Sequence, residues 1–176
     1  MTEAPAREKF EQALTDPVYE AAWRYALRLA GSRPDAEDLL QSALARAFVR
    51  FGQLRRPEAF RAWLFAIVRN EFLSHKRPAA AVSGGGDAAL DYIPAGMPAD
   101  PAAREVLDAL ASLPWNHREV LELFYLERLS LKETAAVLGV GVSAVKQRVM
   151  RARRALRELV LPRREPGVPA QGGESA

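Results

Sequence analysis

The chain lacks cysteine altogether, which excludes a disulfide framework, a thiolate metal site and a cysteine nucleophile. Its two histidines, His75 and His117, have no nucleophile or carboxylate partner at a recognisable spacing, so a helical enzyme is the least favoured class. No uninterrupted apolar run is long enough to cross a bilayer, and the charged N-terminus does not resemble a signal peptide. We therefore expect a cytoplasmic protein with no metal, no cofactor and no catalytic residues.

A strong net charge is also missing, since 25 Lys and Arg stand against 22 Asp and Glu. Residues 1–77 hold 13 basic and 10 acidic side chains, and residues 101–161 hold 10 and seven. Between them, residues 78–100 hold three acidic and no basic side chains, are rich in Ala, Gly and Pro, and have no helical or strand period. This composition predicts a flexible linker between two small domains, with a disordered tail at 162–176.

Strand signals are absent from the N-terminal block, and prolines and glycines mark the ends of its helices. Proline near a first position and glycine after a last position predict helices over residues 16–31, 34–52 and 57–77, the last of which stops before Pro78. The predicted fold class is therefore all-α, with an N-terminal helical bundle and a C-terminal helix–turn–helix domain.

The C-terminal domain contains two helices around a glycine turn. Ser130 and Glu133 have the spacing of a capping box, and Gly139 is a natural stop for the helix that they open. A second helix is expected from about Ser143. Its apolar positions recur at steps of four and three and predict one buried stripe, formed by Val145, Val149, Ala152, Leu156 and Leu159.

The other side of this second helix is basic, with six basic and no acidic residues from Ser143 to Arg157. A surface helix stabilised by its own charges would mix signs at i,i+4 spacing. Together with the preceding capped helix, the face suits the major groove of DNA and its flanking phosphates. The alternative is a solvated basic face without a ligand.

The helix over residues 57–77 carries a second mixed stripe, in which cations and aromatic rings fall within about 80° of one another at 100° per residue. Its members are Arg61, Phe65, Arg69, Phe72 and Lys76. Such a stripe suits single-stranded nucleic acid, because phosphates seek charge and unstacked bases seek flat rings. The alternative is that both phenylalanines pack on a neighbouring helix and the cations extend past them to solvent.

Two stretches of this sequence resemble a known family. DAEDLLQSALARAF, followed by AFRAWLFAIVRNEFLSHKR, is similar to the second conserved region of extracytoplasmic-function (ECF) sigma factors. LASLPWNHREVLELFYLERLSLKETAAVLGVGVSAVKQRVMRARRALREL resembles region four of the same family. The resemblance covers about residues 10–161, with region two in 1–77 and region four in 101–161. It implies a two-domain sigma factor that joins core RNA polymerase, directs it to a promoter and helps to open the DNA.

The resemblance also implies roles for individual residues. The acidic helix would dock on the clamp helices of the polymerase largest subunit through Asp35, Glu37, Asp38 and Gln41. The alternative is that these carboxylates do not bind polymerase and only complement the helix dipole at the first turn. Contacts to the downstream (−10) promoter element would come from Arg55, Arg56, Arg61, Phe65, Arg69, Asn70, Phe72 and Lys76. The upstream (−35) element would be bound through Ser143, Ala144, Lys146, Gln147, Arg148, Arg151, Arg153 and Arg154.

Further partners follow from the same resemblance: the flap of the second-largest polymerase subunit and an anti-sigma protein, with the factor itself a monomer. The chain departs from the family pattern at Leu54, where phenylalanine is usual, and at Gly141 and Ala144, where hydroxyl side chains are usual. A stand-alone helix–turn–helix regulator is the rival class. It would account for residues 101–161 and leave 1–77 unassigned.

Overall fold

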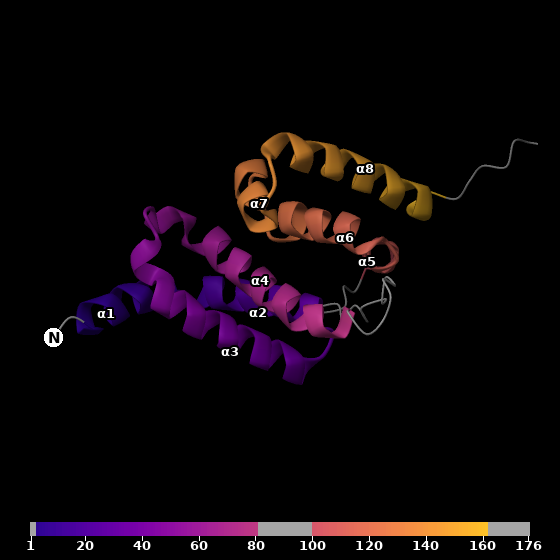
Figure 1. Ribbon diagram of the computed structural model, residues 1–176. Helices are drawn as coiled ribbons and strands as arrows, with labels where there is room; N and C mark the ends of the chain where they lie inside the picture. The colour runs from indigo at the N-terminus through magenta and orange to yellow at the C-terminus, as the bar shows by residue number, and fades with distance from the viewer. Residues whose placement is uncertain (1–2, 81–99, 162–176) are drawn as a thin grey trace, which may run out of the picture.

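The computed structural model describes residues 3–80 and 100–161, and within these two ranges every element is helical (Figure 1). The α-helices are α1 (Glu3–Ala13), α2 (Asp16–Ala30), α3 (Arg33–Arg50), α4 (Phe60–Ala80), α5 (Pro101–Ala111), α6 (Trp115–Leu121), α7 (Leu131–Leu138) and α8 (Val142–Val160). Short 3-10 turns, η1 (Phe51–Gln53) and η2 (Pro57–Ala59), connect α3 to α4, and a π-helical turn, η3 (Glu122–Leu126), extends α6. The predicted all-α class is confirmed.

The N-terminal half is a bundle of α2, α3 and α4 that buries the apolar stripe of each helix. Gly31 ends α2 in the left-handed conformation, with φ 80°, and Ser32 then caps α3 by accepting a hydrogen bond from the Asp35 amide. Helix α1 was not predicted. It packs through Phe10, whose ring makes edge-to-face contacts with Phe48, Phe51 and Phe60.

The predicted end of the third helix is wrong, because α4 continues through Pro78 to Ala80. Proline removes one backbone hydrogen bond and crowds the preceding turn, but in the last turn of a helix few bonds remain to be lost. The start also differs slightly, since Pro57 opens a 3-10 turn before the regular helix begins at Phe60.

The C-terminal half confirms the capping box and the glycine turn. Ser130 accepts from the Glu133 amide while the Glu133 carboxylate accepts from the Ser130 amide, and Gly139 has φ 66°. Helix α8 begins at Val142, and its predicted stripe is buried at Val145, Val149 and Ala152. The prediction is wrong for Leu159, whose side chain is exposed in the last turn of α8.

The two halves pack directly on each other, with α4 against α7 (Figure 1). This contact between the halves was not predicted from the sequence. Most of the predicted linker (81–99) and the predicted tail (162–176) lie outside the described residues. Among the helices that are described, none combines the length and the apolar character that a bilayer crossing requires.

Candidate nucleic-acid interface

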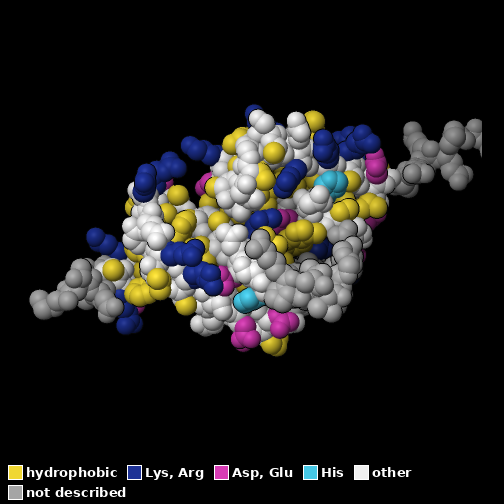
Figure 2. All heavy atoms as spheres, viewed as in Figure 1, with side chains coloured by type: hydrophobic (Ala, Val, Ile, Leu, Met, Phe, Trp, Pro, Cys, Tyr) yellow, Lys and Arg dark blue, Asp and Glu magenta, His cyan; other side chains and the backbone are white. Residues whose placement is uncertain are grey.

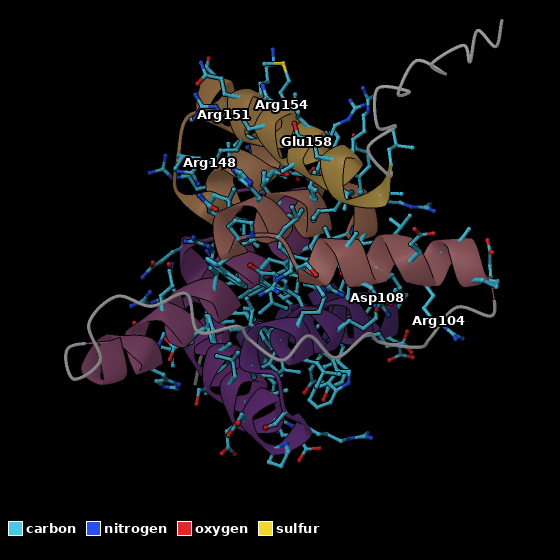
Figure 3. The ribbon with its side chains drawn as sticks, turned by 90° about the vertical axis from the view of Figure 1, so that its right-hand side faces the viewer. Arg104, Asp108, Arg148, Arg151, Arg154 and Glu158 are labelled. Atoms are coloured by element: carbon cyan, nitrogen blue, oxygen red, sulfur yellow. The ribbon has the colours of Figure 1, made fainter. Side chains whose placement is uncertain are left out.

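Helix α8 presents its polar side away from the rest of the protein. Figure 3 shows Arg151 and Arg154 on the outer side of α8, away from the N-terminal half, and Arg148 extending from the flank of the helix. The side chains of Ser143, Lys146, Gln147, Arg151, Arg153 and Arg154 are exposed, whereas Ala144 and Arg148 are half-buried. All eight predicted −35 residues thus lie on one helix, and the first helical turn is open to solvent.

The charge of this helix is almost uncompensated. Its one ion pair among the described residues joins Arg154 Nε to Glu158 Oε1 at 3.1 Å, at an exposed i,i+4 position. Figure 2 shows Lys and Arg side chains gathered over α8. Exposed cations on one helix of a helix–turn–helix unit can neutralise phosphates, while Gln147 can hydrogen-bond to a base edge.

The predicted stripe of cations and rings on α4 is not one open surface. Phe65 is fully buried and stacks on Tyr25 of α2, with ring centroids 4.9 Å apart. Phe72 is also buried, and its ring lies 5.8 Å from that of Trp115 in α6. The expectation that these rings stack on bases is therefore wrong for Phe65, because it belongs to the α2–α4 core. Phe72 is covered by the C-terminal half.

The cations of the same stripe are engaged with the C-terminal half. Arg69 donates from Nε to Glu119 Oε1 at 2.7 Å and from a terminal nitrogen to Oε2 at 3.2 Å. Arg61 donates to the Glu127 carboxylate at 2.9 Å and to the Glu127 carbonyl oxygen at 2.7 Å. Asn70 is exposed, so it remains open to a ligand.

The remaining predicted −10 residues differ in what the structure describes. Arg55 and Arg56 are exposed in the turn between η1 and η2, whereas the Lys76 side chain lies outside the described side chains. Next to that turn, a hollow of about 640 Å³ lies between α1 and η1, lined in part by Lys9, Gln12 and Leu54. Its volume exceeds that of one nucleobase.

A group of buried and half-buried charges joins the two halves, and no pattern in the sequence predicted it. We call it the interdomain ionic cluster; it consists of Arg28, Arg61 and Arg69 from the N-terminal half and Glu119, Glu122 and Glu127 from the C-terminal half. Arg28 contacts both Glu127 and Glu122, the latter at 3.3 Å between Nε and Oε2. The three glutamate side chains are only 1–2% exposed. The one available signal was three glutamates in an otherwise apolar stretch.

Burial perturbs two groups of this region. It raises the pKa of Glu122 from 4.5 to about 7, although the Arg28 and Arg118 guanidinium groups lower it in part. Burial also raises the pKa of Tyr25, whose hydroxyl donates to Glu119 at 3.2 Å. Both Glu122 carboxylate oxygens are buried without a hydrogen bond among the described residues. Glu122 is therefore the least satisfied member of the interdomain ionic cluster.

The π-helical turn η3 explains how all three glutamates reach the same side. At about 100° per residue, five residues of α-helix would separate Glu122 and Glu127 by about 140°. Here the Glu127 amide donates to the Glu122 carbonyl oxygen at 2.9 Å, which is the i→i+5 bond of a π-helix. The wider turn brings both carboxylates toward Arg28. Arg128, directly after it, has φ 53°, an uncommon left-handed value for an arginine.

The four predicted polymerase-docking residues lie at the start of α3. Asp35, Glu37, Asp38 and Gln41 are all exposed. Three of them, Glu37, Asp38 and Gln41, line a hollow of about 500 Å³ together with Tyr19 and Trp23 of α2. Acidic groups beside two aromatic rings can receive a basic helix or loop.

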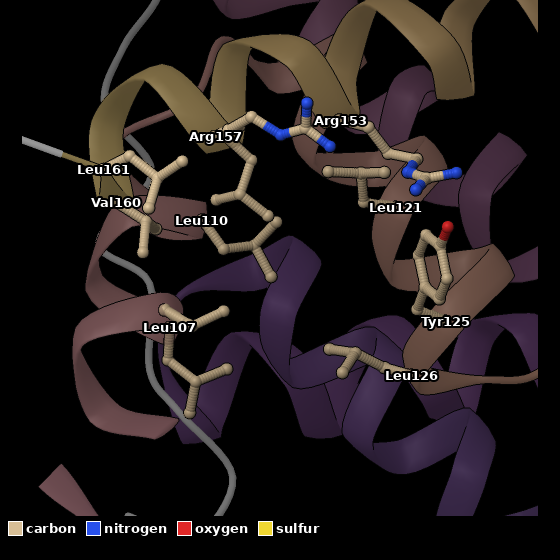
Figure 4. A pocket seen from close by; sticks show the side chains of 11 residues that line it. Leu107, Leu110, Leu121, Tyr125, Leu126, Arg153, Arg157, Val160 and Leu161 are labelled. Carbon is tan, nitrogen blue, oxygen red and sulfur yellow. The ribbon is translucent and has the colours of Figure 1, made fainter. Parts of the chain in front are cut away.

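An apolar groove of about 420 Å³ opens between α5, η3 and the end of α8 (Figure 4). Leu107, Leu110 and Leu121 lie along it, and Arg153 and Arg157 extend from α8 across one side. Such a groove suits the apolar face of an amphipathic helix whose polar side carries carboxylates. No metal-binding arrangement of three or more His, Cys, Asp or Glu occurs in the described parts of the chain.

Family comparisons match both halves of the chain. The sigma-70 region 2 family matches residues 14–81, and the sigma-70 region 4 family matches residues 103–156. The chain is 36% identical over 162 residues to the ECF RNA polymerase sigma factor SigL of Mycobacterium tuberculosis (strain ATCC 25618 / H37Rv), covering 88% of this chain and 90% of the relative. It is 28% identical over 153 residues to the ECF RNA polymerase sigma factor SigM of Bacillus subtilis (strain 168), covering 82% and 93%.

Solved structures give the same similarity. The sigma factor RpoE in complex with the anti-sigma factor NepR, from Bartonella quintana, matches with 31% identity and a TM-score of 0.68, covering 86% of this chain and 96% of that chain. CnrH in complex with the cytosolic domain of CnrY matches with 27% identity and a TM-score of 0.62, covering 90% and 94%. Both comparisons extend over the two halves of the chain.

Proposed function

Because this chain belongs to the ECF group of sigma-70 family RNA polymerase sigma factors, we propose a division of its surfaces among polymerase, two promoter elements and a regulatory protein. It is an alternative sigma factor that directs RNA polymerase to promoters. The observation that carries this conclusion is the similarity to sigma factors across both halves, in the same order, over 88% of the chain. A stand-alone helix–turn–helix regulator would leave α1–α4 without a role.

Region two is assigned to residues 1–77 and region four to residues 101–161, with 78–100 as the connector and 162–176 as the tail. In region two, the acidic start of α3 would dock on the clamp helices of the polymerase largest subunit. Exposed Asp38 and Glu37, beside the hollow that Trp23 lines, support this assignment, because basic side chains of a partner could pair there while an apolar group enters the hollow.

The −10 element would contact the surface that runs from the η1–η2 turn along α4. Exposed Arg55, Arg56 and Asn70 can reach it directly. One extruded base would enter the hollow beside Leu54, where burial of the base offsets the cost of unstacking it, a few kcal/mol. Arg61 and Arg69 would join this surface once they leave their glutamate partners.

The −35 element would be read by α8. Gly141 caps this helix without a side-chain hydrogen bond, so the exposed first turn offers Ser143 and backbone amides to a phosphate. Lys146, Gln147 and Arg151 would touch base edges or neighbouring phosphates, and Arg148, Arg153 and Arg154 would bind mainly to phosphate. Half-buried Ala144 can offer only an apolar surface, such as a partner for a thymine methyl group.

The apolar groove of region four would bind protein rather than DNA. We assign it to the flap of the second-largest polymerase subunit, with Arg157 pairing with an acidic residue of that partner. Two structural relatives are bound to an anti-sigma factor or to the cytosolic domain of CnrY, and by analogy an anti-sigma protein would regulate this chain. The factor would act as a monomer in the cytoplasm, where it meets polymerase and DNA, and would perform no covalent chemistry itself.

A direct test is binding of the purified full chain to bacterial core RNA polymerase, followed by site-specific photo-crosslinking from α8 to promoter DNA. The proposal predicts a stable one-to-one complex, with crosslinks from Gln147 to the upstream element only when polymerase is present. Failure to bind core polymerase, together with salt-sensitive binding of specific duplexes by the free protein, would favour the stand-alone regulator.

A further inference from the structure

Two cations that the proposed function assigns to the −10 strand are occupied by the protein itself. Arg69 is 16% exposed and Arg61 is 35% exposed, and each donates two hydrogen bonds to a residue of the C-terminal half. The acceptors, Glu119 and Glu127, are 2% exposed. Region four therefore covers part of the surface that region two would present to DNA.

The contact between Arg69 and Glu119 has the geometry of phosphate recognition. The Arg69 guanidinium places two nitrogens on the two carboxylate oxygens of Glu119, at 2.7 and 3.2 Å. The same two-point fork is how arginine binds a phosphate group, so a carboxylate held there satisfies the same donors. Arg61 is held differently, since one terminal nitrogen donates both to a carboxylate oxygen and to the backbone carbonyl oxygen of Glu127.

We propose that the acidic side of α6 and η3 is an intramolecular competitor for DNA, in which Glu119 and Glu127 occupy on Arg69 and Arg61 the places of backbone phosphates. This inference rests on the proposed function, because it takes Arg61 and Arg69 to be contacts of the −10 strand. The π-helical turn is part of the device, since it brings Glu127 to the side where the other two glutamates lie.

Binding of the glutamates and binding of a DNA strand exclude each other. One guanidinium fork cannot serve a carboxylate and a phosphate at once, and Trp115 covers Phe72 on the same side of α4. A strand can therefore reach these groups only when the halves separate. The apparent affinity for the strand then equals the affinity of the separated form multiplied by the fraction of molecules in which the halves are separated. A partner that binds the separated form raises that fraction and restores the affinity. Core polymerase is the partner that the proposed function supplies.

The test measures binding of the free, full-length protein to fluorescein-labelled random-sequence single-stranded DNA of about 16 nucleotides. The variant Glu119→Gln/Glu127→Gln keeps the shape of both side chains and removes their charge. We expect the variant to bind this DNA about tenfold or more tightly than the unsubstituted chain. A gain of that size corresponds to about one tenth of the unsubstituted molecules having separated halves. The matched control, Glu11→Gln/Glu20→Gln, removes two exposed carboxylates from α1 and α2 and should leave the affinity unchanged.

A second variant keeps the inference testable if the double substitution unfolds the chain, as judged by circular dichroism. Trp115→Ala weakens the same contact between the halves without altering a charge, and it should also strengthen binding. Unchanged affinity in the folded variants, or an equal gain in the Glu11→Gln/Glu20→Gln control, would overturn the competition.

The variant Arg69→Ala distinguishes a failure of the proposed function from a failure of the competition. Arg69→Ala should impair promoter opening by the holoenzyme and should abolish the gain seen in Glu119→Gln/Glu127→Gln. Full promoter opening by Arg69→Ala would remove that arginine from the −10 surface and the competition with it. Impaired opening by Arg69→Ala, with no gain in the glutamate variants, would overturn the competition alone.

Discussion

Arg69 and Glu119 form a two-point ion pair between α4 and α6, fifty residues apart in sequence, and thereby join the two halves of the protein. This pair and its neighbours join the two domains that the sequence predicted. The cations proposed to bind DNA, Arg61 and Arg69, thus contact the acidic side chains of region four.

Arg28 should contribute more to stability than any exposed arginine. It contacts both Glu122 and Glu127 and is 4% exposed, so Arg28→Ala leaves buried Glu122 without its ion-pair partner and Glu127 paired with Arg61 alone. We expect a loss of about 3–5 kcal/mol in the free energy of unfolding, measured by urea denaturation. Arg24→Ala is the control, because its contact to Glu20 is an exposed pair at 3.8 Å and should be worth less than about 1 kcal/mol. Equal effects of the two substitutions would contradict this prediction.

Glu122 should make stability depend on pH. Its pKa is about 7 in the folded protein and 4.5 ordinarily, so between those values the folded state binds more protons than the unfolded state. The contribution of Glu122 is therefore full below about pH 4.5 and is lost as the pH rises to about 7, with a slope of at most about 1.4 kcal/mol per pH unit. Four charged neighbours also act on the pKa of Glu122: Arg28 and Arg118 lower it, and Glu119 and Glu127 raise it.

The measurement is urea unfolding at several pH values for the unsubstituted chain and for Glu122→Gln. The difference in unfolding free energy between them should change steadily across this window, whereas exposed Glu158→Gln should leave the profile unaltered. Parallel profiles for Glu122→Gln and the unsubstituted chain would show that Glu122 does not titrate there.

Arg151 should contribute to −35 recognition. It is exposed on the outer side of α8 and has no ion-pair partner among the described residues. Arg151→Ala should weaken promoter binding by the holoenzyme by about 1–3 kcal/mol if it contacts a base edge, and should lower the salt dependence if it contacts phosphate. Arg50→Ala, an exposed substitution on α3, should change neither quantity. Unchanged affinity and salt slope for Arg151→Ala would exclude the residue from the interface.

Asp38 should be required for polymerase binding. Asp38→Lys reverses an exposed charge at the hollow lined by Trp23 and should abolish binding to core polymerase, while the helical circular dichroism spectrum stays unchanged. Glu11→Lys, the same reversal on α1, should bind normally. Retained affinity in Asp38→Lys would contradict the docking assignment.

Local signals in the sequence predicted several of the helices and the caps at their ends. Ser130, Glu133 and Gly139 act through groups a few residues away, so their pattern is sufficient to specify the first helix of the helix–turn–helix unit. The same holds for Gly31 at the end of α2. Helix α1 was missed because Phe10 is its only buried apolar side chain among those described, and a single apolar residue cannot show a helical period.

The contact between the halves could not be predicted in this way. Arg69 and Arg61 have the same helical positions whether they face phosphate or carboxylate, and only the three-dimensional arrangement distinguishes the two. Periodicity likewise could not separate Phe65, which stacks inside the bundle, from a ring exposed to bases. A π-helical turn leaves no mark in hydrophobic spacing, so the alignment of Glu122 with Glu127 was hidden as well.

Run-off transcription with purified core RNA polymerase and genomic DNA fragments tests the central claim most directly. We expect discrete new transcripts that require this chain, with start sites that share one upstream and one downstream sequence element. Transcripts that are the same with and without the chain would contradict its assignment as a promoter-directing sigma factor.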